Sequence, residues 1–154
     1  MIAHATLEAL VRGADWSCTS GFKPVGGSRG NSIVVKAGDF VAAAGGKDTV
    51  RISVTAELHT DLAPVGTTYT ATEASARSGF SATHPDAVSG PAPGVGDKST
   101  VHTSVATASA RLVALAGNVI IRVDYTDTSG AADATVPAGD AATRIAAEVI
   151  AQLR

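Results

Sequence analysis

The sequence predicts an α+β fold, in which an antiparallel sheet carries helices mainly on one face. Residues 49–58 alternate apolar and polar side chains, as expected of an antiparallel strand with one buried and one solvated side. Two aliphatic runs flank a Gly-Asn pair at residues 117–118, which is the signal of a β-hairpin. An amphipathic helix over residues 140–153 would cover that hairpin. The length allows one domain, residues 1–154, around its own core.

A short helix and a strand are predicted first. Residues 6–12 carry two leucines and a valine on one helical face, and the helix ends at Gly13. Residues 16–22 alternate, so that Trp16 and Cys18 share one side of a strand. Cys18 is the only cysteine, and the strand offers no positive charge that would activate a thiol. We therefore expect Cys18 to be a small buried side chain.

Further strands and a weak helix follow in the middle of the chain. Residues 31–36 and 40–44 are two β-prone runs that precede the alternating strand. Three prolines and three glycines make residues 84–96 a loop, and residues 101–107 begin the final part of the sheet. Between them, residues 71–77 have a thin helical stripe that consists only of Ala71, Ala74 and Ser75.

The hairpin near the C-terminus allows two registers. If residues 117–118 form the loop, Arg111 lies opposite Asp124. If residues 116–117 form it, Arg111 lies opposite Arg122. Opposite charges across a strand pair are mildly favourable and like charges are unfavourable, by roughly 0.2–1 kcal/mol. We therefore predict the first register.

The last helix has a start signal and a clear apolar stripe. Residues 137–140 read Pro-Ala-Gly-Asp, and Asp140 is the predicted N-cap that would accept hydrogen bonds from the first-turn N–H groups. Arg144, Glu148 and Gln152 form the polar side. The apolar side consists of Ala142, Ile145, Ala146, Val149, Ile150 and Leu153.

Two parts of the chain resemble each other. The text FVAAAG at residues 40–45 resembles LVALAG at residues 112–117, and RISVT at residues 51–55 resembles RVDYT at residues 122–126. The similarity suggests an internal repeat of two tandem β-β-β-α units, over residues 31–79 and 100–153.

Composition and motif context argue against several function classes. The 12 basic and 14 acidic residues give a net charge of −2 without a Lys/Arg cluster, so nucleic acid is not an expected partner. No apolar run approaches the roughly 18 residues of a transmembrane segment. The four histidines lack metal-ligand spacing, and the Gly-rich residues 26–30 and 90–99 lack the flanking elements of a nucleophile elbow or a phosphate loop. We expect no catalytic residues, no metal and no cofactor.

Three features together resemble a known family. They are the segment VSGPAPGVGD at residues 88–97, the hairpin at residues 110–125 and the Ala-rich end of the last helix at residues 146–151. The chain resembles the extracytoplasmic domains of actinobacterial cell-envelope lipoproteins of unknown function, which are broadly similar in layout to receptor Ser/Thr kinase sensor domains. The resemblance covers residues 16–153. Cys18 matches one member of a cysteine pair that the family often carries, while the second cysteine and the lipid-anchor segment are missing.

The resemblance implies a non-catalytic, extracytoplasmic binding or sensing domain whose partner is an unknown small molecule or protein. The alternative is a structural protein, cytosolic or part of a virion, that works through self-association as a homo-oligomer. Residues 1–4 do not begin a signal peptide, so a removed leader and a cytosolic protein both stay open.

The candidate binding residues are Arg122, Arg51 and Tyr69. Both arginines hold matching mid-strand places in the two repeats, on the polar side of the sheet, and a guanidinium offers forked donors to an anionic or polar group. Arg122 is the stronger candidate, because the predicted register brings apolar Val113 and Ile120 near it. Tyr69 would join them from the preceding loop region.

Overall fold

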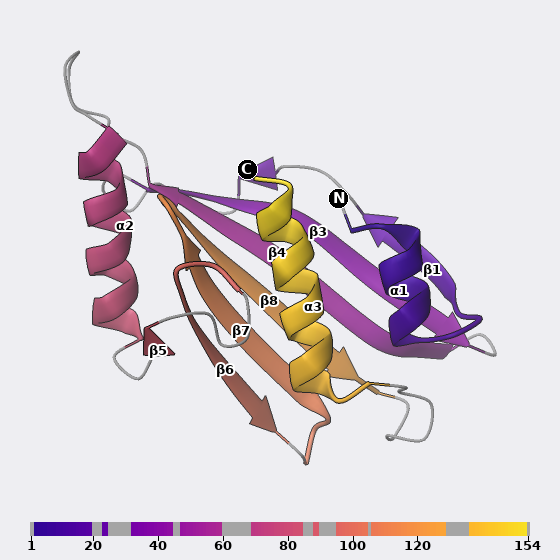
Figure 1. The fold of residues 1–154 in the computed structure, drawn as a ribbon. Coiled ribbons are helices and arrows are strands. Elements are labelled where there is room, and N and C mark those ends of the chain that lie inside the picture. Colours follow the sequence, from indigo (N-terminus) through magenta and orange to yellow (C-terminus); the bar gives the residue numbers. More distant parts are fainter. Residues whose placement is uncertain are drawn as a thin grey trace.

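The computed structural model describes residues 2–19, 23–24, 32–44, 47–59, 69–84, 88–89, 95–104, 106–128 and 136–153 (Figure 1). Its helices are α1 (His4–Leu10), α2 (Tyr69–Thr83) and α3 (Ala138–Ala151). Its strands are β1 (Asp15–Thr19), β2 (Lys23–Pro24), β3 (Ser32–Ala44), β4 (Lys47–His59), β5 (Val88–Ser89), β6 (Lys98–Ser104), β7 (Ser109–Ala116) and β8 (Val119–Asp127).

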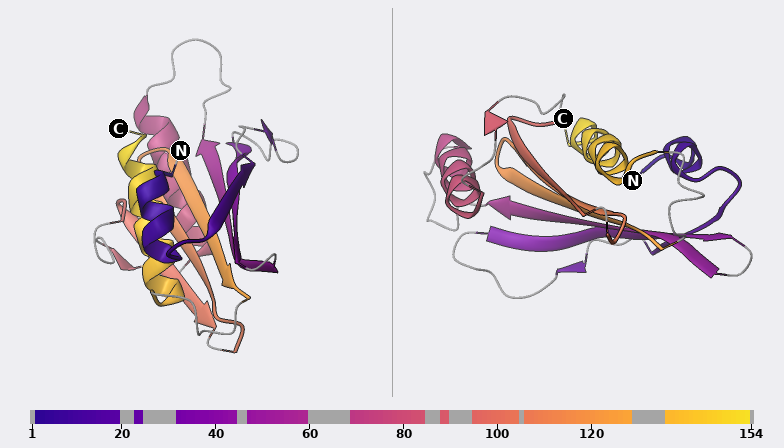
Figure 2. Two further views of the ribbon diagram at one scale, coloured as in Figure 1. Left: turned by 90° about the vertical axis from the view of Figure 1, so that its right-hand side faces the viewer. Right: turned by 90° about the horizontal axis from the view of Figure 1, so that it is seen from below.

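The described strands form one antiparallel sheet, in the order β1-β3-β4-β8-β7-β6-β5, and β2 pairs with β3. Helices α1 and α3 pack on one side, which we call the core face, and α2 packs on the other side. Figure 2 shows strands β6 to β8 passing between α2 and α3. The predicted α+β fold with helices mainly on one face is therefore confirmed.

The sheet consists of two three-stranded meanders that meet edge to edge. Strands β1, β3 and β4 form the first meander, and β6, β7 and β8 form the second. Across the junction Ser53 lies opposite Asp124, while Arg51 faces Thr126 and Thr55 faces Arg122. The paired residues occupy equivalent positions of the two similar segments, residues 51–55 and 122–126. A local two-fold axis therefore relates β4 to β8. The two helices break this symmetry, since α2 and α3 lie on opposite faces.

The first meander differs from the predicted unit over residues 31–79. The two runs predicted as separate strands join into the single 13-residue strand β3, so β1 supplies the third strand of the meander. The register of β3 against β4 shifts between Lys36 and Gly38, which marks a bulge. A Cβ on Gly38 would lie 2.9 Å from the ring of Phe40. Glycine therefore lets the ring lie over the backbone, and the chain continues as a strand.

The hairpin adopts the predicted register. Residues 117–118 form the two-residue loop, and Gly117 has a φ of 59°, as the first central residue of a type II′ turn requires. Arg111 lies opposite Asp124, and its Nε donates to Oδ1 of Asp124 over 2.5 Å. The carboxylate of Asp97 accepts a hydrogen bond from the N–H of Gly117 over 2.8 Å, which ties the segment before β6 to the turn.

The main core lies between the sheet and helices α1 and α3. On β4 the predicted alternation places Val50, Ile52 and Val54 in this core, whereas Ala56 and Leu58 lie outside it. Ile145 of α3 also belongs to the core, and Val149 packs against its margin. The buried residues of β4, β7 and β8 that were predicted together are Val50, Ile52, Val54, Leu112, Ile121 and Val123. A hydrogen bond from the Ala3 N–H to Oε1 of Glu148, over 2.5 Å, joins the segment before α1 to α3.

Helix α3 begins two residues earlier than its predicted N-cap. Pro137 is the N-cap, and the N–H of Ala141 already donates to the Pro137 carbonyl over 2.9 Å. Asp140 is therefore an acidic residue of the first turn, not the cap. Proline suits the position because its missing N–H needs no partner there. No side chain caps the first turn of α3 in the described structure.

Cys18 is exposed, so its predicted burial is wrong. It lies in β1, at the outer edge of the sheet, and pairs with Phe40 of β3. Alternation along the strand was read correctly for Trp16, which packs against the core. A short edge strand has no neighbour to cover its outer part, so alternation alone does not bury a side chain there.

Helix α2 is longer than predicted and uses a different stripe. Ala74 and Ser75 are exposed, whereas Ala76 and Phe80 are fully buried. These two residues lie one turn apart and pack on Val113 and Leu115, which form a second cluster with Ile120 on the face opposite the main core. The side chain of Ala71 lies outside the described residues.

Candidate functional site

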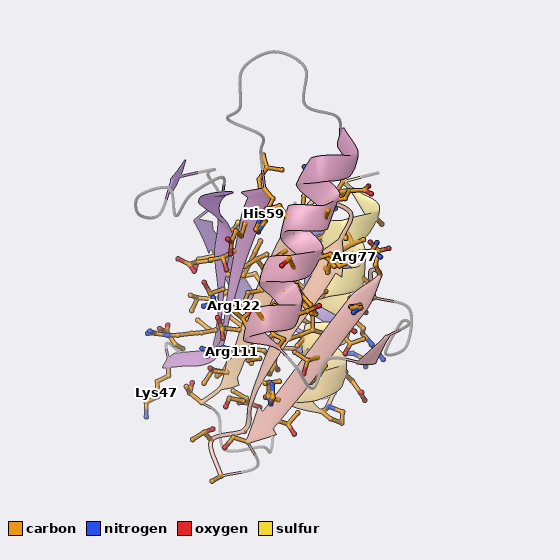
Figure 3. All side chains as sticks on the ribbon, turned by 90° about the vertical axis from the view of Figure 1, so that its left-hand side faces the viewer. Lys47, His59, Arg77, Arg111 and Arg122 are labelled. Atoms are coloured by element: carbon orange, nitrogen blue, oxygen red, sulfur yellow. The ribbon has the colours of Figure 1, made fainter. Side chains whose placement is uncertain are left out.

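The face opposite the main core is polar and only partly covered. Helix α2 covers one end of it, and we call the remainder the open face (Figure 3). Strand pairing arranges its side chains in three parallel rows that run across β4, β8, β7 and β6. The rows are Thr55, Arg122, Val113 and Thr100; then Ser53, Asp124, Arg111 and His102; then Arg51, Thr126, Ser109 and Ser104.

Arg122 lies in the row that reaches the cluster under α2 at Val113. Its neighbours across the strands are Thr55 and the buried Val113, and the half-buried Ile120 precedes it on the same side of β8. The side chain of Arg122 is exposed. Among the described residues it makes no hydrogen bond and no ion pair. The guanidinium of Arg122 therefore lies beside apolar Val113 and Ile120, without a counter-ion among the described residues.

One histidine, His84, comes close to Arg122, and sequence spacing gave no sign of this. His84 follows the C-terminal end of α2 and stacks at a tilt on Phe80, with ring centroids 5.1 Å apart. Burial, then the charge of Arg122 and then that of His102, lower the pKa of His84 below its usual 6.5. Figure 3 places Arg122 beside this end of α2. His84 therefore links Arg122 and His102 into one cluster of donors, and protonation of His84 adds positive charge to the cluster as the pH falls.

A shallow hollow of about 370 Å³ lies beside this cluster. The ion pair between Arg111 and Asp124 forms part of its wall, and His102 forms another part. The side chains of Arg111 and Asp124 are 59% and 35% exposed, so their pair is open to solvent and contributes little to stability. The hydroxyl of Thr100 lies 3.4 Å from Nε2 of His102, within hydrogen-bond reach.

The other two predicted residues lie farther away. Arg51 shares the open face but lies two rows from Arg122, about 14 Å along the strands. Its guanidinium already donates to Asp48 over 2.6 Å. Tyr69 is the first residue of α2, about 20 Å of helix from His84, and its side chain lies outside the described residues. The structure thus brings Arg122 near His84, not near Arg51 or Tyr69.

A hydroxyl, an imidazole and a carboxylate also meet under α2. Nδ1 of His59 lies 3.4 Å from Oγ of Ser75, within hydrogen-bond reach. Nε2 of the same ring lies 3.4 Å from Oε1 of Glu57, but this second contact lacks hydrogen-bond geometry. The order resembles a nucleophile, a base and an acid. Both contacts are longer than the roughly 2.6–3.2 Å of a working nucleophile–base pair, although such pairs are often looser in unliganded proteins.

The described residues contain no group of three or more His, Cys, Asp or Glu side chains that could hold a metal ion. Within the same residues, no helix has the length and apolar character needed to cross a membrane. Comparison of the chain with protein-family models, curated proteins and solved structures gives no match.

Proposed function

We propose that the protein is a non-catalytic binding or sensing domain that captures an anionic group at Arg122 on the open face. The observation that carries the proposal is the exposed guanidinium of Arg122, which has no counter-ion among the described residues. Its forked donors match a carboxylate or a phosphate-like group. Val113 and Ile120 remove part of the surrounding water, which strengthens a charged hydrogen bond.

We propose an extracytoplasmic, cell-envelope location for this function. The support is the resemblance of the turn at residues 88–97, the hairpin and the last helix to actinobacterial lipoprotein domains. The genomic sequence upstream of Met1 tests the location. A signal peptide or a lipid-anchor motif there would support it, and an untranslated region would contradict it.

One observation favours the alternative of self-association. Strand β5 pairs only with Lys98 and Ser99, so residues 100–104 of β6 have no outer partner strand in the described structure. An unpaired edge of this kind can take up a strand from a second copy. Light scattering distinguishes the alternatives, because a large assembly that persists in the Arg122→Ala variant would favour the structural role.

Replacing Arg122 by alanine is expected to weaken anion binding at least about 10-fold, because a hydrogen bond to a charged group contributes about 1.5–3 kcal/mol. The measurement is a ¹H–¹⁵N NMR titration with acetate or sulfate at matched ionic strength. Acetate stands for a carboxylate ligand and sulfate for a phosphoryl or sulfuryl ligand, so the tighter of the two identifies the class. Arg122→Lys keeps the charge without the fork and should recover only part of the affinity.

Arg51→Ala is the matched control for this titration. Arg51 lies on the same face, but it is paired with Asp48 and is 64% exposed. Its loss should leave the affinity nearly unchanged. Equal affinities of wild type and Arg122→Ala would contradict the proposal. So would covalent labelling of Ser75 by a fluorophosphonate, because it would show an activated nucleophile in a protein proposed to be non-catalytic.

Anion binding is expected to tighten as the pH falls from about 7.5 to about 5.5. Burial and the neighbouring charges of Arg122 and His102 lower the pKa of His84 in the free protein. A bound anion would offset that repulsion and raise the pKa of His84 again. Binding therefore takes up a proton at pH values between the pKa of His84 in the free protein and its pKa in the complex. Sulfate titrations at several pH values measure this gain, and His84→Gln should flatten the profile. An affinity that weakens with falling pH would argue against the cluster.

A further inference from the structure

A second hollow lies on the core face, away from Arg122. It has a volume of about 580 Å³ and lies between the ends of β6, β7 and β8 and the start of α3. Its lining is rich in small residues, among them Ser104, Ala108, Ala138 and Gly139. A Cβ on Gly139 would lie 3.1 Å from the methyl group of Thr103, so glycine allows α3 to begin close to β6. The small side chains leave the space unfilled.

The wall of this hollow contains a polar group that the protein leaves unsatisfied. Tyr125 of β8 lines the hollow and is only 1% exposed, and its hydroxyl has no hydrogen-bond partner among the described residues. A buried hydroxyl without a partner costs about 1–3 kcal/mol, so natural proteins seldom keep one without a reason. Burial and then the charge of Asp127 raise the pKa of Tyr125 to about 12, so the hydroxyl keeps its proton and can donate.

The start of α3 adds further donors. Residues 137–140 line the hollow, and no described side chain caps the N–H groups of this first turn. The exposed N–H groups at a helix N-terminus favour an acceptor oxygen. Two independent features on different elements therefore need the same chemistry, which is a hydrogen-bond acceptor.

The charges around the hollow restrict that acceptor. Asp127 and Asp140 are the charged residues among its described lining, and both are acidic. A carboxylate or phosphate ligand would be repelled by them. An ammonium ligand would have no acceptor to offer to Tyr125 and the helix N–H groups. An uncharged oxygen acceptor meets both conditions.

We propose that this hollow binds an uncharged small molecule with an apolar body and a carbonyl-type oxygen, which accepts a hydrogen bond from the Tyr125 hydroxyl at the start of α3. The site is separate from the anion site proposed at Arg122, because neither Arg122 nor His84 lines this hollow, although Ser104, Ser109 and Tyr125 also line the shallow hollow beside His102. Each can be tested without the other.

The test uses three probes with the same six-carbon chain: hexanamide, hexanoate and hexylammonium. In ¹H–¹⁵N NMR titrations of the whole protein, hexanamide is expected to shift the amide signals of residues 103–104, 108–109 and 138–140, and to bind more tightly than either charged probe. Tyr125→Phe keeps the ring and removes the hydroxyl. It should weaken hexanamide binding about 2- to 10-fold, the equivalent of one neutral hydrogen bond.

The same variant separates a binding role from a structural role. Because the hydroxyl has no partner in the part of the chain that the structure describes, Tyr125→Phe should leave the thermal stability unchanged or raise it. A clear loss of stability would show that the hydroxyl serves the fold and would overturn the proposal. Ala138→Leu fills the hollow and should abolish binding, whereas Arg122→Ala should not affect it. No hexanamide binding up to its solubility limit, or equal binding to wild type and Tyr125→Phe, would also overturn it.

Discussion

Truncation of Ile121 to alanine is expected to lower the free energy of unfolding by about 2–5 kcal/mol, which is the range for large-to-small changes in a close-packed core. Ile121 is 0% exposed and lies in β8, the strand that joins the two meanders. Its side chain belongs to the same cluster as Ile145 of α3. The lost methyl groups would leave a cavity that neither the sheet nor the helix can close.

Urea unfolding measured by circular dichroism checks this value. Leu153→Ala is the matched control, because it removes as many carbon atoms from a side chain that is 51% exposed. That change should stay within about 0.5 kcal/mol. A loss below the same limit for Ile121→Ala would show that the sheet does not bury this side chain.

Replacement of Gly96 by alanine is expected to cost about 2–5 kcal/mol of unfolding free energy, from backbone strain and a steric clash together. Gly96 has a φ of 68°, and a Cβ would collide with the backbone carbonyl oxygen of Leu115. The adjacent Asp97 N–H donates to that same oxygen over 2.7 Å. The clash therefore also breaks the contact that holds this segment against the hairpin.

Gly13→Ala separates the two causes. Gly13 has a similar φ of 70°, but a Cβ there would have nothing within 4 Å. It should cost only the strain of a left-handed residue, about 1–2 kcal/mol. Thermal unfolding of both variants gives the difference. If the two variants lost equal stability, the close approach of Gly96 to Leu115 would be disproved.

Local patterns were enough to predict the parts of the fold whose structure depends on near neighbours. The register of the last hairpin followed from the Gly-Asn loop and from the charges of Arg111 and Asp124, which form the expected ion pair. The inward faces of β4 and β8 followed from strict alternation. The stripe of α3 followed from helical spacing, but its cap was misplaced, and Leu153, which was predicted in the stripe, lies beyond the end of the helix and is exposed.

Features that depend on distant contacts were not predictable from the sequence. The stripe of α2 rests on Phe80, which lay beyond the predicted end of the helix, and nothing in the local text places it on the face opposite α3. The continuity of β3 depends on the ring of Phe40 lying over Gly38. From the sequence alone, a glycine at this position equally suggests a break between two strands. Exposure of Cys18 depends on β1 being an edge strand.

The candidate site divides in the same way. Alternation placed Arg122 and Arg51 on the polar face, and the hairpin register placed Val113 beside Arg122. The approach of His84 required the whole path of α2, because histidines at distant positions show no spacing signal. The partnerless hydroxyl of Tyr125 was also hidden, since only three-dimensional packing shows which buried polar groups lack a partner.

The edge-to-edge junction of the two meanders has a consequence for folding kinetics. Within each meander, the paired strands are close together in the sequence, so only short loops must close to form the pairs. The β4–β8 junction instead pairs Ser53 with Asp124, far along the chain, and must close a loop that contains α2 and the strands β5 to β7. Closing this long loop costs entropy, and only the β4–β8 contacts, which we expect to form last, offset that cost. We therefore expect the pairing of the two meanders to limit the folding rate, and a shorter connection between them to speed folding.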